Sequence, residues 1–415
     1  MAAPDQRNIV IIGGGIIGCT TAYYLSRHPS VASTITVLEA SAHGVAQGAS
    51  GKAGGLVAKW AYPKELVAVS FPEHVRLAEE HDGAARWGWR FVGCGSWEGD
   101  GVPAREEDKE SGTGVGGGGR RKSLEKKLGL EPEHEVNGGG DTTGLPQDLD
   151  WVAREQTTAY APMAPAGHTA QVHPYLFTTS MMDLATANGA ALVQGRATQI
   201  VISNDGRVSG VVYQTSDSEQ PHTLPATHVV LAAGAWSPTI APLAALPISA
   251  TRAHSITIRP RPPASIAPYV LFTEIRLPAA QSRRTVTVSP EIYARPDNEV
   301  YACGPGDDSV LPGSVDDVEV DQAACESIRE HVASISRELR EGVVERRQAC
   351  FLPSIPGGPV VGAADKIAKG MYIATGHTCW GICNAPGTAK ALAELILEGK
   401  IKSGNLKKLS PSNFL

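Results

Sequence analysis

Three glycines near the start of the chain, Gly13, Gly15 and Gly18, and the acid Glu39 have types and spacing suited to binding a dinucleotide. In a Gly-x-Gly-x-x-Gly motif the first glycine permits a tight turn, the second lets backbone approach a pyrophosphate, and the third lets a helix pack closely on a strand. The N–H groups and dipole at the helix start favour the negative charge of the phosphates. Glu39 follows Gly18 by 21 residues and can accept hydrogen bonds from both ribose hydroxyls. The alternative interpretation is a strand–helix–strand unit that binds no ligand.

Two further glycine-rich loops are suited to contact the same ligand. The loop from His43 to Gly55 consists mostly of small residues, which let backbone approach a flat or charged group, and adds a hydroxyl at Ser50 and a cation at Lys52. Its alternative interpretation is a flexible surface loop. The loop over residues 376–387 runs into a helix, so it is a second place to hold an anionic or electron-rich group.

Other residues with chemical potential are a strand pair and the cysteines. Period-two alternation puts Tyr293 and Arg295 on one face of a predicted strand. Seven scattered cysteines indicate reduced thiols in an intracellular compartment. Cys379 and Cys383 lie four apart without a metal-ligating set beside them, so we expect packing thiols and no metal site.

The elements that would position these residues follow a mixed α/β pattern. An apolar, β-branched run from Ile9 to Ile12 predicts a buried parallel strand, and Pro29 ends the helix that follows it. His173 and Pro174 predict a helix start, with His173 as its cap or as a packing histidine; the alternative is a catalytic histidine. The remaining predicted elements are a strand at 35–39, a helix over 64–91, strands at 227–234 and 370–375, antiparallel sheet over 248–303, a helix over 324–339 and a last helix through 389–396.

Length and charge restrict the class of protein. A chain of 415 residues is too long for one simple core and predicts two intertwined domains. A net charge of -6 argues against nucleic acid as the main partner. No apolar run reaches the roughly 18 residues of a membrane span, so we expect a cytoplasmic protein without such a span. Residues 98–144 are rich in glycine and charge and predict a disordered insert or long surface loop, a plausible docking segment for a protein partner.

Four blocks of the sequence together resemble the D-amino-acid oxidase/glycine oxidase/sarcosine oxidase family of FAD-dependent oxidoreductases. They are the first glycine motif with Glu39, the run 48–54, the run 230–237, and the closing loop at 374–387. The resemblance spans about residues 7 to 400 apart from the insert. The detail of residues 145–151 and 170–174 is similar to a fungal branch of the family.

This resemblance implies FAD as the cofactor and an α/β fold, in which a Rossmann-like FAD-binding domain (GR2-type) carries an inserted α+β substrate domain built on an antiparallel sheet. The FAD-binding domain would be discontinuous over residues 7–93, 168–245 and 345–400, the substrate domain would comprise 145–167 and 246–344, and 401–415 would form a C-terminal tail. The positions expected to contact FAD are Gly13, Gly15, Ile16, Ile17, Gly18, Glu39, Ala40, Ser50, Gly51, Lys52, Ala53, Gly54, Ala197, Thr198, Ala233, Gly234, Trp236, Cys350, Gly376, His377, Trp380, Gly381, Ile382 and Cys383.

The usual reaction of this family takes a hydride from the carbon next to an amine and gives it to flavin N5, and the imine product then hydrolyses. Arg295 matches an arginine that glycine oxidase-like relatives place on a strand to hold the substrate carboxylate. The alternative is an ion pair with Asp297. Tyr293 would assist Arg295, or simply pack in the core. Cys350 falls where sarcosine oxidase-like relatives attach flavin through sulfur, and a buried, inert thiol explains it equally well.

The sequence also departs from the family pattern at two positions. Cys383 stands near the place where sarcosine oxidases carry a lysine beside the flavin, and Leu352 stands where glycine oxidase-like proteins carry an arginine. These departures leave the electron acceptor and the substrate open. The leading hypothesis is an FAD-dependent oxidase or dehydrogenase that acts on the C–N bond of an amino acid or related amine. The alternatives are a flavin-loaded binding, regulatory or trafficking protein with little turnover, and an NAD(P)-linked oxidoreductase that uses the first motif.

Overall fold

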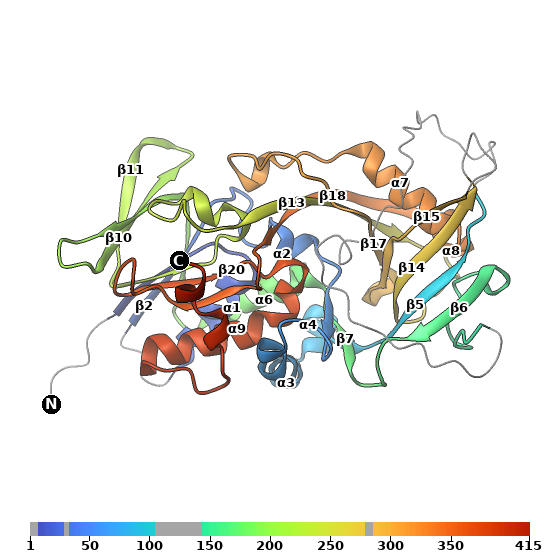
Figure 1. Ribbon diagram of the computed structural model, residues 1–415, viewed down its shortest axis with the longest axis horizontal. Helices are drawn as coiled ribbons and strands as arrows, with labels where there is room; N and C mark the ends of the chain where they lie inside the picture. The colour runs from blue at the N-terminus through green and yellow to red at the C-terminus, as the bar shows by residue number, and fades with distance from the viewer. Residues whose placement is uncertain (1–6, 29–32, 104–142, 279–284) are drawn as a thin grey trace.

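A six-stranded sheet at one end of the molecule is built around the first strand of the chain (Figure 1). The computed structural model describes residues 7–28, 33–103, 143–278 and 285–415. The strand order is β19 (Val360–Ala363), β20 (Met371–Thr375), β12 (His228–Leu231), β1 (Arg7–Ile12), β2 (Ser33–Glu39) and β8 (Ala191–Gln194). Neighbours pair in parallel except β19, which runs antiparallel to β20. Distant parts of the chain therefore form one mainly parallel sheet, and β1 is the buried parallel strand that the sequence predicts.

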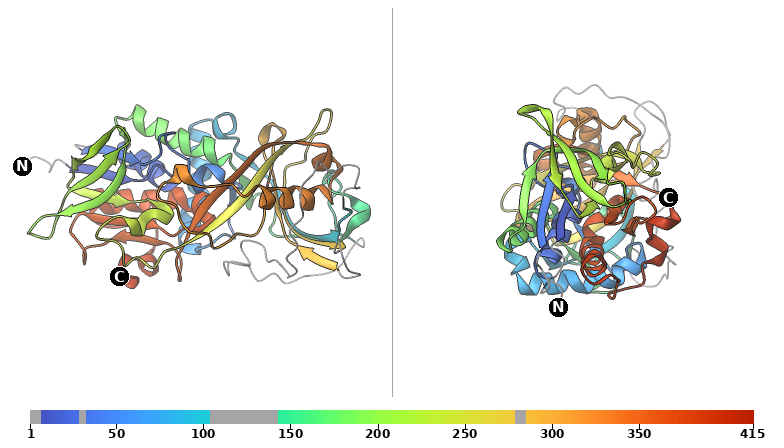
Figure 2. Two further views of the ribbon diagram at one scale, coloured as in Figure 1. Left: turned by 90° about the horizontal axis from the view of Figure 1, so that it is seen from above. Right: turned by 90° about the vertical axis from the view of Figure 1, so that its left-hand side faces the viewer.

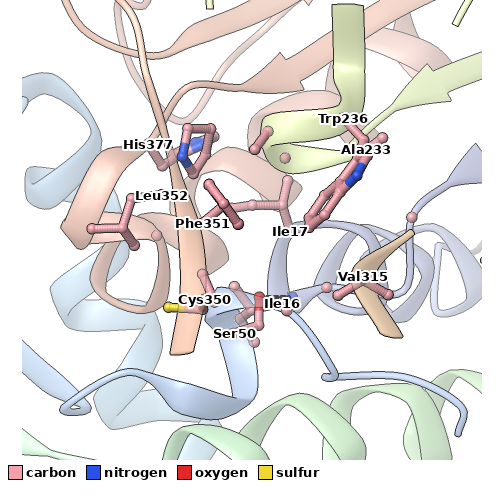
Figure 3. A pocket seen from close by; sticks show the side chains of 18 of the residues that line it. Ile16, Ile17, Ser50, Ala233, Trp236, Val315, Cys350, Phe351, Leu352 and His377 are labelled. Atoms are coloured by element: carbon pink, nitrogen blue, oxygen red, sulfur yellow. Dashed lines mark hydrogen bonds between the residues drawn. The ribbon is translucent and has the colours of Figure 1, made fainter. Parts of the chain in front are cut away.

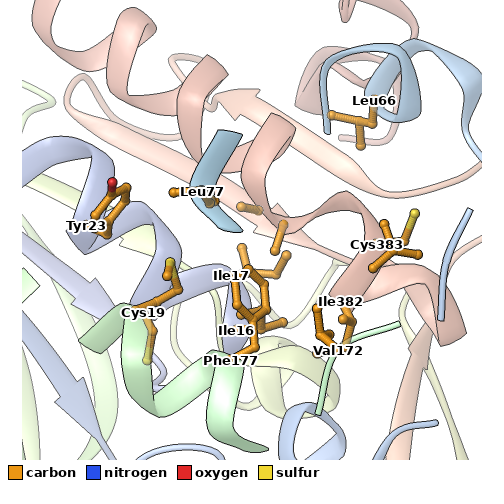
Figure 4. Packing of buried hydrophobic residues seen from close by; sticks show 14 of the residues in the cluster. Ile16, Ile17, Cys19, Tyr23, Leu66, Leu77, Val172, Phe177, Ile382 and Cys383 are labelled. Carbon is orange, nitrogen blue, oxygen red and sulfur yellow. The ribbon is translucent and has the colours of Figure 1, made fainter. Parts of the chain in front are cut away.

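Helices cover this sheet and form the larger hydrophobic core. Helix α1 (Ile16–Ser26) lies against both α6 (Pro174–Ala187) and α9 (Gly381–Glu398), and α3 (Lys64–Glu80) packs on α9. Figure 4 shows Ile16 and Ile17 of α1 gathered with Phe177 of α6 and Ile382 of α9. Because α1 is enclosed in this way, its first turn is held in a fixed place at the end of β1.

Two helix starts show how the sequence sets these elements. His173 caps α6 as predicted, because its Nδ1 accepts a hydrogen bond from the Leu176 N–H at 3.4 Å. Helix α9 begins at Gly381, earlier than expected, although Pro386 lies inside it and cannot donate to the Ile382 carbonyl. The His74 Nε2 of α3 lies 3.1 Å from that carbonyl oxygen and supplies the missing partner. Burial lowers the pKa of His74 to about 4, so the ring is neutral.

An eight-stranded sheet forms the other end of the molecule, and its long strands β13 and β18 extend back toward the six-stranded sheet (Figures 1 and 2). The strand order is β18 (Val343–Ser354), β13 (Ser249–Arg259), β17 (Val300–Cys303), β16 (Glu291–Ala294), β14 (Tyr269–Pro278), β5 (Gly93–Asp100) and β6 (Thr157–Pro162), with β15 (Thr285–Val288) also paired to β14. All pairs are antiparallel except β14 with β5. The predicted antiparallel sheet is therefore confirmed.

Several predicted elements have different bounds. The single helix expected over 324–339 is two helices, α7 (Gln322–Ala333) and α8 (Arg337–Glu341), because Ser336 caps a new helix by accepting from the Leu339 N–H at 3.2 Å. The helix expected over 64–91 ends at Glu80. After it come α4 (Gly83–Trp87) and the short strand β4 (Arg90–Phe91), which belongs to a small sheet with β3 (Leu56–Ala58) and β7 (Thr169–Gln171).

Parts of the predicted insert and of the predicted tail pack into the fold. Residues 98–100, assigned to the insert, are the end of β5 and pair with β14, while 104–142 lie outside the described residues. The last residues of the chain pack against β19 of the six-stranded sheet, with Leu406, Leu409 and Pro411 buried. A further antiparallel sheet contains β9 (Arg196–Ile202), β10 (Val208–Thr215) and β11 (Ser218–Pro225).

Candidate functional site

The turn between β1 and α1 leaves no room for a side chain at Gly13 or Gly18. Gly13 has φ +109°, and a Cβ there would lie 2.5 Å from the Ala232 carbonyl oxygen at the end of β12. A Cβ at Gly18 would lie 1.9 Å from the Gly13 carbonyl oxygen. Gly15 has an ordinary φ of -76°, and its missing side chain leaves backbone open beside Ser50. The three glycines therefore have different surroundings, and their contacts with a dinucleotide stay predictions.

Glu39 and Ser50 organise the loops around this helix start. Glu39 is buried, its Oε2 accepts from the Gly14 N–H at 2.6 Å, and its Oε1 accepts from the Ser41 N–H at 2.7 Å. Burial raises the pKa of this carboxyl group, and the two amides oppose that rise. Each carboxylate oxygen has a second lone pair, so ribose hydroxyls can still bind. The Ser50 Oγ accepts from the Ile16 N–H at 2.9 Å and fixes the loop to the first turn of α1.

One elongated cavity connects this turn to the antiparallel sheet. Its lining includes Gly13, Gly15 and Glu39 at one end and Glu291, Tyr293 and Tyr301 at the other. Figure 3 shows side chains from α1, from the Ser50 loop, from β18 and from the closing loop converging on it. The cavity therefore joins the glycine turn to the antiparallel sheet.

All predicted cofactor residues line this cavity except Gly18, Gly51, Thr198 and Cys383. Gly51 and Gly18 instead allow close backbone packing, since a Cβ at Gly51 would lie 2.0 Å from the Ala46 carbonyl oxygen. The Thr198 hydroxyl donates to the Val212 carbonyl on the neighbouring strand at 3.3 Å. Cys383 lies in the core, its thiol donates to the Ala58 carbonyl at 3.6 Å, and burial raises its pKa to about 12.

The closing loop supplies a rigid, uncharged wall. Gly376 has φ +81°, and a Cβ there would lie 2.6 Å from the Ile355 side chain. His377 is 4% exposed, its Nε2 lies 3.0 Å from the Thr388 Oγ1, and burial lowers its pKa to about 3. Thr378 adopts a left-handed conformation at φ +52°, which a β-branched residue rarely does. Strain of this kind gathers where surrounding structure holds a loop for function.

Lys52 and Cys350 lie on opposite segments of the same part of the cavity. The Lys52 Nζ donates to the Ala349 carbonyl at 3.1 Å, and burial lowers the pKa of its ammonium group. Burial raises the pKa of the Cys350 thiol to about 11, although Lys52 opposes that rise. A buried thiol with a raised pKa is a poor nucleophile. The covalent flavin link at Cys350 stays a prediction.

The antiparallel sheet presents Glu291, Tyr293, Tyr301 and Cys303 to the cavity. In the register of β16 with β17, Glu291 lies opposite Cys303 and Tyr293 lies opposite Tyr301. The Tyr293 hydroxyl donates to the Glu291 Oε2 at 2.6 Å. The Tyr293 ring lies directly over Gly54, where a Cβ would come within 2.8 Å of it. This face therefore meets the Ser50 loop at the end of the cavity away from Glu39.

Arg295 does not line the cavity. It follows the last residue of β16, is 4% exposed, and its Nη1 lies 3.1 Å from the Glu299 Oε2. A second guanidinium nitrogen donates to the Ala53 carbonyl, and the guanidinium carbon stacks 4.7 Å from the centre of the Tyr301 ring. The ion pair is thus with Glu299 rather than with Asp297. This geometry gives no support to a carboxylate-binding role for Arg295.

Sequence reasoning missed two parts of the site. Glu291 lies two residues before Tyr293, so the same period-two argument would have placed it on the cavity face. The segment before α7 crosses the cofactor end of the cavity, which Val315 lines. Its Asp316 accepts from the Ser41 hydroxyl at 2.6 Å and from the Ala42 N–H at 2.9 Å. No local pattern predicted that contact, because it joins residues far apart in the chain.

Within the part of the chain that the structure describes, no helix is long and apolar enough to cross a membrane. Among those same residues, no set of three or more His, Cys, Asp or Glu side chains is grouped to hold a metal ion.

Comparison with known proteins gives matches along nearly the whole chain. The family model described as FAD dependent oxidoreductase (DAO) matches residues 8–395. TDA3 of Saccharomyces cerevisiae, whose name gives an oxidoreductase without a substrate, is 32% identical over 509 residues, covering 99% of this chain and 95% of TDA3. The crystal structure of L-proline dehydrogenase from P. horikoshii has a TM-score of 0.69 at 17% identity and covers 99% of this chain and 98% of that chain. Glycine oxidase from Geobacillus kaustophilus has a TM-score of 0.67 at 18% identity, with 98% of both chains covered. At these identities the two structures show a shared fold.

Proposed function

The chain belongs to the DAO family of FAD-dependent oxidoreductases, as its sequence predicted, and we propose that it oxidises the C–N bond of an amino acid or related amine. The observation that carries this proposal is the single cavity that runs from Glu39 to the Glu291–Tyr293 face. A dinucleotide extended from its ribose at Glu39 would bring its reactive ring to a sheet face built from polar and aromatic side chains. A binding site for substrate next to the ring is what the reaction requires.

The residues of the chain fit FAD without further change. Gly13 and Gly15 leave the space that a pyrophosphate needs, and the first turn of α1 supplies N–H groups. Glu39 would hold the ribose. The Ser50 loop and the closing loop would grip the ring from two sides. When bound, FAD accepts a hydride from the carbon next to the amine.

The remaining chemistry falls to the substrate and the protein. The amine nitrogen must be neutral when the hydride leaves, so a proton passes first to solvent or to a nearby base. Loss of the hydride leaves an iminium ion, and water converts it to a carbonyl compound and an amine or ammonium ion. The protein's tasks are to orient the reacting carbon, to exclude water and to hold the remainder of the substrate.

Solved structures with this fold carry the names of both a dehydrogenase and an oxidase, so the proposal does not specify the electron acceptor. The cytoplasmic location and a partner that binds the 98–144 segment stay predictions. The division of the chain into the predicted domain ranges is also part of this proposal.

An anaerobic reduction screen tests the proposed function. Purified yellow holoprotein is mixed without oxygen with a panel of amino acids and amines, and loss of the visible flavin band is followed. We expect at least one class of compound to bleach the band, while dithionite bleaches it in every sample as the positive control. Protein that binds FAD and is bleached by dithionite, but by no amine or amino acid, would instead support a flavin-loaded binding protein with little turnover.

A further inference from the structure

One buried carboxyl group in the cavity has an oxygen without a hydrogen-bond partner among the described residues. Glu291 is 3% exposed and lines the cavity. Its Oε2 accepts from the Tyr293 hydroxyl at 2.6 Å and lies 3.6 Å from the Cys303 thiol. Its Oε1 has no hydrogen-bond partner among the described residues. A buried carboxyl oxygen left in that state costs free energy unless a ligand supplies a donor.

The neighbours of Glu291 suit a positively charged group. Tyr293 and Tyr301 lie beside it on the same face, with ring centres 5.5 Å apart at an interplanar angle of 77°. The Tyr301 ring already holds the Arg295 guanidinium, 4.7 Å from the ring centre. Tyr293 also meets the Phe272 ring at 6.5 Å. A carboxyl group next to aromatic rings is a combination that attracts ammonium groups, through charge-assisted hydrogen bonds and the electron-rich ring faces.

A substrate carboxylate usually pairs with an arginine or a lysine. Among the described residues that line the cavity, Arg196 is the one arginine, and it lies beside Ala197 on β9. Arg295 lies outside the lining and is paired with Glu299. Lys52 already donates to the Ala349 carbonyl. Leu352 lines the cavity where glycine oxidase-like relatives were expected to carry an arginine. An ionised carboxyl group at Glu291 could only accept hydrogen bonds and would repel a second carboxylate.

We propose that Glu291 binds the protonated nitrogen of the substrate and takes up the proton that must leave this nitrogen before the hydride does, and that the substrates of this chain are cationic amines which need no carboxylate. This inference rests on the proposed function for its identification of the ligand as a substrate. It goes beyond that proposal by choosing amines over amino acids and by naming the residue that makes the choice.

Binding of an unreactive probe tests the site apart from turnover. The tert-butylammonium ion has no hydrogen on the carbon next to nitrogen and so cannot be oxidised in this way, and pivalate has the same shape with a negative charge. Each is titrated into holoprotein, and the flavin absorption change and the heat of binding are recorded. We expect tert-butylammonium to bind and pivalate not to bind.

Variants assign the effect to Glu291. Glu291→Gln keeps the size and an acceptor for Tyr293 but removes the charge, so it should weaken tert-butylammonium by about tenfold or more while retaining FAD. Glu291→Asp should recover part of the loss. Glu73→Gln is the matched control, because Glu73 is a buried acid away from the cavity, paired with Lys390 at 2.7 Å. It should bind the probe like the parent protein.

Two further results decide the question. In the anaerobic screen, butane-1,4-diamine should bleach the flavin faster than ornithine, and pyrrolidine faster than proline. Equal probe binding by the parent protein and Glu291→Gln, tighter binding of pivalate, or loss of FAD from Glu291→Gln would overturn the assignment. Charge-dependent probe binding without bleaching by any compound would leave the cation site standing and refute the proposed function, so the two failures are distinguishable.

Discussion

Replacing Gly18 by alanine should separate the third glycine of the dinucleotide motif from the other two by its effect on the protein without FAD. The new Cβ would lie 1.9 Å from the Gly13 carbonyl oxygen, where α1 crosses the end of β1, and Gly18 itself is buried. Ordinary contact begins at 3.4 Å, so the first turn of α1 must move by roughly 1.5 Å.

The magnitude follows from two opposing effects. Overpacking of a core costs about 1–3 kcal/mol. A clash between a Cβ and a backbone carbonyl oxygen belongs at the upper end, because neither atom can rotate away. Alanine recovers at most about 1 kcal/mol over glycine in a helix. We therefore expect Gly18→Ala to destabilise the apoprotein by about 2 kcal/mol. The shifted amides should also weaken FAD by about tenfold to a hundredfold.

Gly15→Ala provides the contrast, because Gly15 has an ordinary φ and its new Cβ would meet only the Ser50 Oγ at 3.0 Å. It should leave the melting temperature of the apoprotein nearly unchanged and still reduce FAD binding, since the Cβ occupies the space for the pyrophosphate. Both variants are compared by thermal melting of apoprotein and by FAD titration. A Gly18→Ala apoprotein that melts like the parent and binds FAD equally well would refute this account of the turn.

Three other predictions follow from buried polar groups. Arg295→Met leaves Glu299 buried without its partner, which typically costs about 3–5 kcal/mol, so the melting temperature should fall while the ratio of flavin bleaching by acids and by amines stays the same. Asp316→Asn weakens the contacts to Ser41 and Ala42 over the cofactor, so release of FAD, followed by its fluorescence, should become several-fold faster. His377 has a pKa of about 3 in the folded protein, against an ordinary value of 6.5. Below pH 6.5 its ring therefore takes up a proton only when the protein unfolds, so stability should fall as pH drops from 6.5 toward 3. In thermal melts across that range, His377→Asn should make this loss smaller.

For each of these three predictions, one result would contradict it. A selective loss of bleaching by acids in Arg295→Met would restore its predicted carboxylate role. Unchanged release of FAD from Asp316→Asn would show that the segment does not retain the cofactor. An unchanged pH profile in His377→Asn would mean that this ring does not contribute to the acid sensitivity.

Sequence patterns predicted the cofactor end of the molecule better than the substrate end, and the reason is physical. The glycine motif, the flanking strands and Glu39 all act within one short stretch, so their spacing carries the geometry directly. The capping role of His173 was equally local. These predictions needed only turn conformation, strand period and helix capping.

The substrate end depends on contacts that no short stretch contains. Arg295 was predicted to face the cavity with Tyr293, but β16 ends at Ala294 and the chain then turns, so the guanidinium meets Glu299 instead. Cys383 was placed beside the flavin because it stands near a lysine position of sarcosine oxidases. In the structure it lies inside α9, and its thiol donates to the Ala58 carbonyl of β3. Tertiary packing sets the surroundings of both side chains.

The measurement that tests the central claim most directly is the visible spectrum of the purified protein during anaerobic addition of an amine. The account predicts a bound flavin whose band is present in the parent protein, is weaker in purified Gly15→Ala, and disappears when a cationic amine is added without oxygen. A parent protein that is colourless and takes up no FAD would contradict it.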